Sequence, residues 1–126
     1  DFGASTFSGQ SVEILPQTFS LDVDNSGGTP NNADGIMLAR YLVLRARGAA
    51  ITAGRSTEDP ATVQGNIDAG FSSGVLDIDS SGTPPNNADG IMLARYLVLR
   101  ARGAAITAGR STEDPATVQA NIEALL

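Results

Sequence analysis

The apolar residues of this chain gather in two matching stretches. In the first, residues 36–44 are apolar at every position except Arg40, and residues 91–99 repeat the pattern around Arg95. A helix that is apolar on all sides must be buried over most of its surface. We predict helices over residues 34–48 and 89–103, each ending at a glycine after two arginines, which suits a helix C-terminus. Either later helices of the chain or a partner would cover them, and the two central arginines would extend to solvent or pair with an aspartate.

A second helical pattern follows each apolar stretch after a short connector, which we expect the apolar Ile51 and Ile106 to anchor. Asp59 and Pro60 put a preferred N-cap before a residue favoured at the first helical position. Val63 and Ile67 then lie at helical spacing, and the same pattern returns 55 residues later. The second copy replaces glycines of this segment with alanine and leucine, so we expect its last helix to be longer and firmer.

The chain is an internal repeat. Residues 21–71 and 76–126 align without a gap and differ at eight positions. Such a repeat predicts two equal units related by a pseudo-twofold axis. One shared core is favoured over two separate domains, because small units bury little surface. The predicted fold class is therefore all-α, with repeat 1 at 21–71, a linker at 72–75 and repeat 2 at 76–126.

Residues 1–20 precede the repeats and are predicted to be irregular. Residues 12–14 alternate like a short strand, which Pro16 stops. The segment is either a linker tail or an N-terminal arm that packs Ile14 or Phe19 on the core. Because the chain begins at Asp1 without an initiating methionine, we expect it to be a piece of a longer protein.

An acidic loop precedes each long apolar stretch. Calcium takes six to eight oxygens, and an EF-hand loop supplies them from positions 1, 3, 5 and 7, a position near 9 and a closing carboxylate, with glycine at position 6. Both loops follow this order, and an asparagine, Asn31 or Asn32 in the first and Asn86 or Asn87 in the second, would supply an amide oxygen. The other predicted ligands are Asp22, Asp24, Ser26, Gly28 through its carbonyl and Asp34 in one loop, and Asp77, Asp79, Ser81, Thr83 and Asp89 in the other.

Both loops depart from the twelve-residue pattern. The closing aspartate stands at position 13, and position 5 carries a neutral hydroxyl. With three carboxylates per ion, we expect a dissociation constant of about 10⁻⁴ to 10⁻³ M. The alternative is a solvated turn in which Asp34 and Asp89 only favour the helix N-terminus.

Composition also favours cations. The net charge is −6, and six of the fourteen acidic residues lie in the two loops, so two calcium ions would offset four charges. The negative charge disfavours nucleic acid and anionic membrane as partners. The chain has no histidine, cysteine or lysine to act as base or nucleophile, so a hydrolase that uses paired carboxylates is disfavoured.

The loop and the helix that follows resemble a known family. An Asp-x-Asp-x-x-Gly loop closed by aspartate and followed by Leu-x-Arg-Tyr-Leu, at residues 38–42 and 93–97, is similar to the calcium-binding F-hand of dockerin domains. It is also similar to longer dockerin-like repeats of bacterial surface proteins. The resemblance implies two bound calcium ions, an extracellular or cell-surface parent protein and a cohesin partner. The residues facing that partner would be Asn32, Ala33, Ala39 and Arg40, with Asn87, Ala88, Ala94 and Arg95 in the second repeat.

The predicted function is thus a calcium-dependent, non-catalytic attachment module of a larger extracellular protein. The alternative is a calcium-stabilised spacer or adhesin repeat without a cohesin partner. An intracellular calcium buffer or sensor is disfavoured by the weak ligand set and by the lack of a methionine-rich groove.

Overall fold

A computed structural model of the protein describes residues 19–126, and every regular element in this range is a helix. The predicted all-α fold class is confirmed, whereas the short strand predicted at residues 12–14 lies outside the described residues. The helices are α1 (Asn32–Leu42), α2 (Ala49–Thr52), α3 (Pro60–Ser73), α4 (Asn87–Leu97), α5 (Ala104–Thr107) and α6 (Pro115–Glu123).

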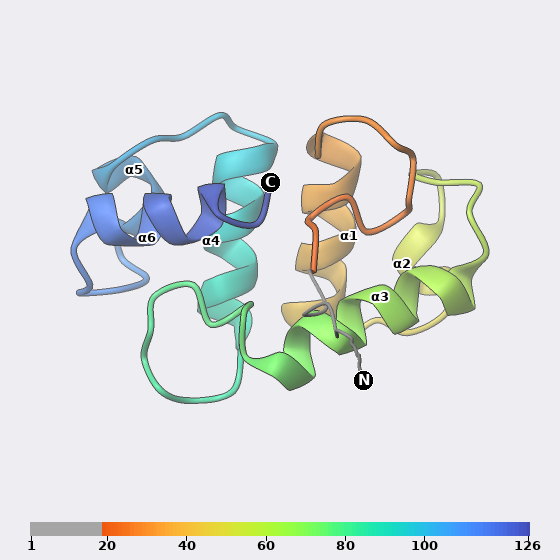
Figure 1. Ribbon diagram of the computed structural model, residues 1–126, viewed down its shortest axis with the longest axis horizontal. Coiled ribbons are helices and arrows are strands. Elements are labelled where there is room, and N and C mark those ends of the chain that lie inside the picture. Colours follow the sequence, from red (N-terminus) through yellow and green to blue (C-terminus); the bar gives the residue numbers. More distant parts are fainter. Residues whose placement is uncertain (1–18) are drawn as a thin grey trace, which may run out of the picture.

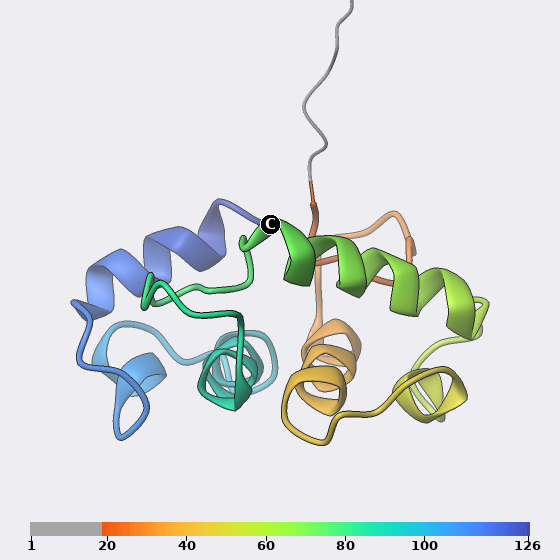
Figure 2. The same ribbon diagram turned by 90° about the horizontal axis from the view of Figure 1, so that it is seen from below.

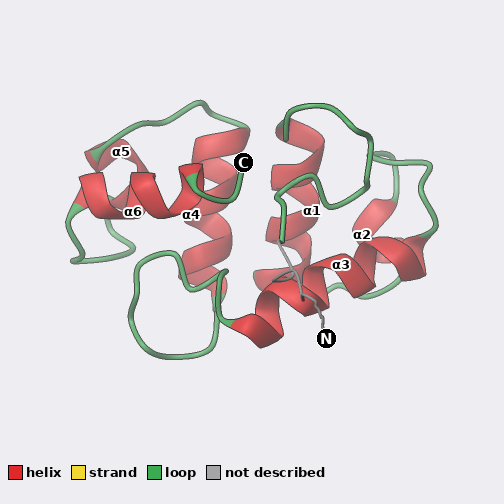
Figure 3. Cartoon of the chain, in the orientation of Figure 1, coloured by secondary structure: helices red, strands yellow, loops and turns green. Residues whose placement is uncertain are grey.

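The long helices α1 and α4 lie side by side at the centre of the molecule (Figure 1). Seen from below, the short helices α2 and α5 lie on their outer sides, and α3 and α6 cross above them as a second layer (Figure 2). Loops make up the remainder, and the two longest of them precede α1 and α4 (Figure 3). The contact of α1 with α4 is the principal helix contact between the repeats, because the other extensive helix contacts stay within one repeat.

The central helices are shorter than predicted and begin earlier. The Asn31 side chain accepts hydrogen bonds from the backbone of Ala33 at 3.0 Å and Asp34 at 3.4 Å, so α1 starts just after Asn31. The predicted end near residue 48 is wrong. Arg45 takes a left-handed φ of +60°, which reverses the chain, and Gly48 precedes the separate turn α2 instead.

The start of the second helix is as predicted, but its relative length is not. The Asp59 carboxylate accepts the Thr62 N–H at 3.2 Å as an N-cap, and Pro60 is the first helical residue. The prediction that the last helix of the second repeat is the longer one is wrong: α3 has 14 residues and α6 has nine. Leu125 leaves the helix and accepts a hydrogen bond from the Leu21 N–H at 3.0 Å, so a contact with the first repeat overrides its helix propensity.

One hydrophobic cluster contains residues of both repeats. Ile51 is fully buried, as expected for an anchor. At the centre, a Cβ placed on Gly35 would lie 2.8 Å from the Leu97 Cβ, and one on Gly90 would lie 2.8 Å from the Leu42 Cβ. Glycine at these points therefore lets the two helix backbones approach closely, and the two contacts are reciprocal. The pseudo-twofold arrangement of the repeats stays a prediction.

The part of the N-terminal segment that is described packs on the fold. Phe19 is partly buried against the core, and its ring lies where a side chain on Gly70 would stand. Of the two residues proposed to anchor an arm, Phe19 does so, and Ile14 lies outside the described residues. Among the helices of residues 19–126, none has the length and apolar character that crossing a membrane requires.

Candidate metal centre

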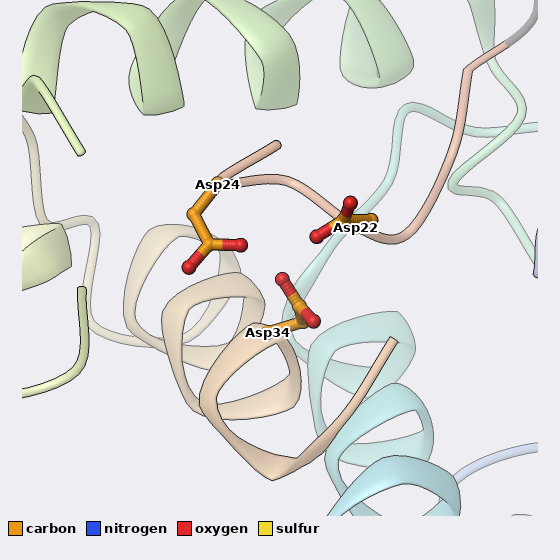
Figure 4. A group of neighbouring side chains, drawn as sticks. All are labelled: Asp22, Asp24 and Asp34. Carbon is orange, nitrogen blue, oxygen red and sulfur yellow. The ribbon is translucent and has the colours of Figure 1, made fainter. Parts of the chain in front are cut away.

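Each loop brings three carboxylates together. Asp22 and Asp24 lie at the start of the loop, and Asp34 lies in the first turn of α1. One oxygen of each lies within 4.8 Å of the others, and the three carboxylates point toward a common space (Figure 4). The second loop repeats the group with Asp77, Asp79 and Asp89. These two acidic triads could each hold a metal ion.

The protein holds Asp34 in place through its own backbone. Its Oδ1 accepts the Val23 N–H at 3.1 Å and its Oδ2 accepts the Asn31 N–H at 2.9 Å, while only 1% of the residue is exposed. In the second loop, Asp89 accepts the equivalent N–H groups of Ile78 at 3.0 Å and Asn86 at 2.9 Å. The closing aspartate therefore ties the start of the loop to the start of the helix.

Asp22 is held by the turn that follows it. Its Oδ1 accepts the N–H of Ser26 at 3.1 Å and the Ser26 hydroxyl at 2.8 Å, and its Oδ2 accepts the Gly27 N–H at 2.9 Å. Gly27 has a φ of +87°, which folds the loop back over the aspartate. Glycine at this position is the residue that the sequence pattern predicted for the turn.

Asp24 differs from the other two members of its triad. Its Oδ1 is buried and has no hydrogen-bond partner among the described residues. An ionised carboxylate oxygen withdrawn from water without a partner costs several kcal/mol. A cation held by the triad would satisfy this oxygen.

Burial, and to a smaller extent neighbouring charge, raises the pKa of the two closing aspartates. Burial raises the pKa of Asp34 to about 6, and the neighbouring charges of Asp24 and Asp22 add to this effect against the hydrogen bonds from Asn31 and Val23. The pKa of Asp89 is likewise raised to about 6, mainly by burial. Burial also acts to raise the pKa of Asp22, but hydrogen bonds from Gly27 and Ser26 outweigh it and the pKa is lowered.

The donor set fits a hard divalent cation. All candidate donors are oxygens, which suit calcium or magnesium, and the chain has no histidine or cysteine for a softer metal. Two full charges at the 4.8 Å limit of the triad repel by on the order of 3 kcal/mol at an effective dielectric constant of about 20. A bound dication would convert this repulsion into attraction.

The remaining predicted ligands have other contacts. The oxygen of Asn31 caps α1, while Asn32 is an exposed first residue of that helix. Gly28 is exposed, and the Ser26 hydroxyl donates to Asp22. In the second loop, Asn86 caps α4, Asn87 is its exposed first residue, and the hydroxyls of Ser81 and Thr83 lie 2.8 Å apart. The three-carboxylate groups are therefore the part of the predicted ligand set that the structure brings together.

Sequence reasoning missed an asparagine that supports each loop. The Asn66 amide reaches from α3 and donates to the Val23 carbonyl at 2.9 Å, and Asn121 makes the equivalent bond to Ile78 at 2.9 Å. The polar residue directly before the buried Ile67 was the available signal. These bonds hold the residue between the first two aspartates of each triad.

Four of the predicted partner-facing residues line one groove. Ala39, Arg40, Ala94 and Arg95 lie along a mostly apolar groove of about 570 Å³ between α1 and α4. Leu44 and Leu99 also line it and are 71% and 72% exposed. The other four do not line this groove: Asn32, Ala33, Asn87 and Ala88 lie in the first turns of the two helices.

The two arginines of this groove form hydrogen bonds within the fold. Arg40 donates through Nη1 to the carbonyls of Ile51 at 2.9 Å and Ala53 at 2.8 Å, at the end of α2. Arg95 makes the same pair of bonds at the end of α5, at 2.9 and 2.7 Å. The expectation that they extend freely to solvent or pair with an aspartate is wrong, because each guanidinium donates hydrogen bonds to backbone carbonyls at the end of a short helix.

Comparison of the chain with protein-family models, curated proteins and solved structures finds no significant match. The dockerin resemblance therefore stays a prediction based on the loop and helix residues.

Proposed function

We propose that the protein is a calcium-dependent, non-catalytic module of a larger extracellular or cell-surface protein. The observation that carries the proposal is the pair of acidic triads, in the first of which a buried Asp24 oxygen has no hydrogen-bond partner within residues 19–126. A group of three carboxylates supplies oxygen ligands of the kind that calcium takes. The absence of histidine, cysteine and lysine favours a binding role over catalysis.

The ion would act through the start of each central helix. Asp22 and Asp24 flank the buried Val23, and Asp34 belongs to the first turn of α1. A cation shared by the three carboxylates would fix this buried segment against the helix. Because α1 and α4 form the main contact between the repeats, filling both loops would stabilise the entire described fold.

Calcium removal tests this proposal. A ligand that binds only the folded state stabilises it by about 2.7 kcal/mol per site at a hundredfold excess over its dissociation constant. We expect calorimetric titration to give two calcium ions per chain, and chelator to lower the melting temperature markedly. Identical melting curves with chelator and with millimolar calcium would rule the proposal out, and a preference for magnesium would correct the ion.

We further propose that the module attaches to a partner protein of the cohesin type. The groove supports this role, because exposed leucines and a continuous apolar lining between two helices are typical of an interaction surface. It is rimmed by Arg40 and Arg95 and draws equally on both repeats. The predicted pseudo-twofold relation of the repeats would let this surface accept one partner in two orientations.

The alternative is a calcium-stabilised spacer without a partner. The bonds from Arg40 and Arg95 to backbone carbonyls favour it, since these side chains are already used within the fold. Titration against a panel of cohesins, with and without calcium, separates the two roles. Calcium-dependent binding that Leu44→Ser together with Leu99→Ser abolishes would support attachment, and no binding to any member would favour the spacer.

A further inference from the structure

The junction between α1 and α4 is built twice from the same residues. Gly35 of α1 faces Leu97 of α4, and Gly90 of α4 faces Leu42 of α1, each at a separation that excludes a side chain on the glycine. The two helices have one sequence, NADGIMLARYL. The surface that α1 presents to α4 is therefore made of the same residues as the surface that α4 presents to α1.

A face that pairs with an identical face is self-complementary. In symmetric dimers, a C2 interface has this property: residue i of one copy contacts residue j of the other, and the reverse. Here the two contacting faces belong to one chain, and residues 31–64 and 86–119 are identical. Nothing in the contact between Gly35 and Leu97 therefore distinguishes a repeat of the same chain from a repeat of a second chain.

We propose that the α1–α4 junction is a homotypic interface through which a second copy of this chain pairs by exchanging repeats. The intramolecular pair is favoured only by the connection between the repeats, which sets an effective concentration of the order of millimolar for a short flexible link. The connection is short: α3 ends at Ser73, and Leu76 is already buried in the core of the second repeat. The exchanged pair makes the same contacts as the folded single chain.

Shortening the link between the repeats would shift the equilibrium from pairing within one chain to exchange between two chains. Gly74 and Val75 are both exposed, so deleting them removes no core side chain. Gly74 also adopts a left-handed φ of +83°, which turns the chain from α3 toward the second loop. A link too short to span its two ends has an effective concentration near zero, and exchange between molecules then replaces pairing within the molecule.

The experiment compares the oligomeric state of three full-length chains in millimolar calcium. We expect the wild type to be monomeric at about 10 µM and to form dimers as its concentration approaches millimolar after refolding. The chain lacking Gly74 and Val75 should be a dimer at about 10 µM with the helical circular dichroism of the wild type. A chain with two residues inserted after Gly74 is the matched control and should stay monomeric at that concentration.

A second pair of variants tests whether the dimer uses this interface. Gly35→Ala in the deletion background should weaken dimerisation at least about tenfold, because its Cβ collides with Leu97. Gly65→Ala in the same background should not, since Gly65 has open space around it. A deletion variant that is monomeric, unfolded or aggregated without native helicity would overturn the proposal, as would a dimer insensitive to Gly35→Ala. The inference does not depend on which ion the loops bind.

Discussion

The two repeats agree at their loops and central helices and differ at their outer ends. Arg45 and Arg100 both take φ of +60°, and the capping bonds of α1 and α4 agree within about 0.1 Å. In contrast, α3 runs for 14 residues and ends at a left-handed Gly74, whereas α6 ends after nine. The identical residues 31–42 and 86–97 thus form the same helix in both places, and the loops keep the same backbone turn although they differ at four positions. The outer helices end differently because their last residues have different neighbours.

The tyrosines of the central helices show the same division. Arg47 lies 4.0 Å from the Tyr41 ring centre, and the equivalent arginine lies 3.9 Å from Tyr96. The hydroxyl partners differ, because Tyr41 donates to Asp68 and Tyr96 donates to Glu123 at 3.3 Å. Burial, followed by the hydrogen bond and charge of the first partner, raises the pKa of Tyr41 to about 12, whereas the pKa of Tyr96 is raised mainly by burial. The tyrosine partners thus differ away from the triads, whereas four of the eight positions that distinguish the repeats lie in the acidic loops. Because the three carboxylates are the same in both loops, we expect each repeat to bind one ion.

The largest expected effect is on the pH dependence of the metal-free chain. The pKa of Asp34 and of Asp89 is raised from 3.8 to about 6. Each group therefore contributes stability that is fully present below about pH 4 and is lost as the pH rises through about 6, by up to about 3 kcal/mol per site. Urea unfolding in chelator from pH 4 to 7 measures this loss.

Asp34→Asn provides the control for this measurement, because asparagine does not titrate. It should remove about half of the pH dependence between pH 4 and 7, and Asp89→Asn should remove the same share. Calcium should suppress the loss in the wild type by stabilising the ionised triads. A profile that neither variant alters would show that the triads do not control acid stability.

Disabling one loop at a time gives the next largest effect. Asp22→Ala with Asp24→Ala, or the same changes at Asp77 and Asp79, should each reduce calorimetric stoichiometry from two ions to one. Each should lower the free energy of unfolding in saturating calcium by about 2.7 kcal/mol at a hundredfold excess of ion. Unequal losses of unfolding free energy would show that the two loops are not equivalent. The cause would then lie in the residues that differ between the loops.

Helix packing should be equally sensitive in both repeats. Gly35→Ala and Gly90→Ala each put a Cβ 2.8 Å from a leucine Cβ on the facing helix, so each should destabilise by about 1 to 3 kcal/mol. Chemical denaturation in calcium measures the two variants side by side. Neutral or stabilising values would mean that the helices separate at little cost.

The smallest effect sharpens the difference between the outer helices. Gly65 lies in α3, where no atom of the described residues would be within 4 Å of an added Cβ, and the second repeat has Ala120 at the equivalent position. Gly65→Ala should therefore stabilise by about 0.5 to 1 kcal/mol, and Ala120→Gly should destabilise by a similar amount. Melting temperatures of this pair, measured beside Gly35→Ala, separate helix propensity from close packing. A destabilising Gly65→Ala would show an unrecognised contact of α3.

The sequence determined the features that depend on neighbours along the chain. The Asp59-Pro60 start of α3, the glycine turn after Asp22 and the grouping of three carboxylates per loop follow from local spacing and backbone preference. Only the tertiary structure decided where the central helices end and that Arg40 donates a hydrogen bond to the Ile51 carbonyl of α2. It also decided that Leu125 lies outside α6 and accepts a hydrogen bond from the Leu21 N–H. These outcomes depend on contacts between residues far apart in the chain, and such contacts outweigh local propensities of less than about 1 kcal/mol per residue.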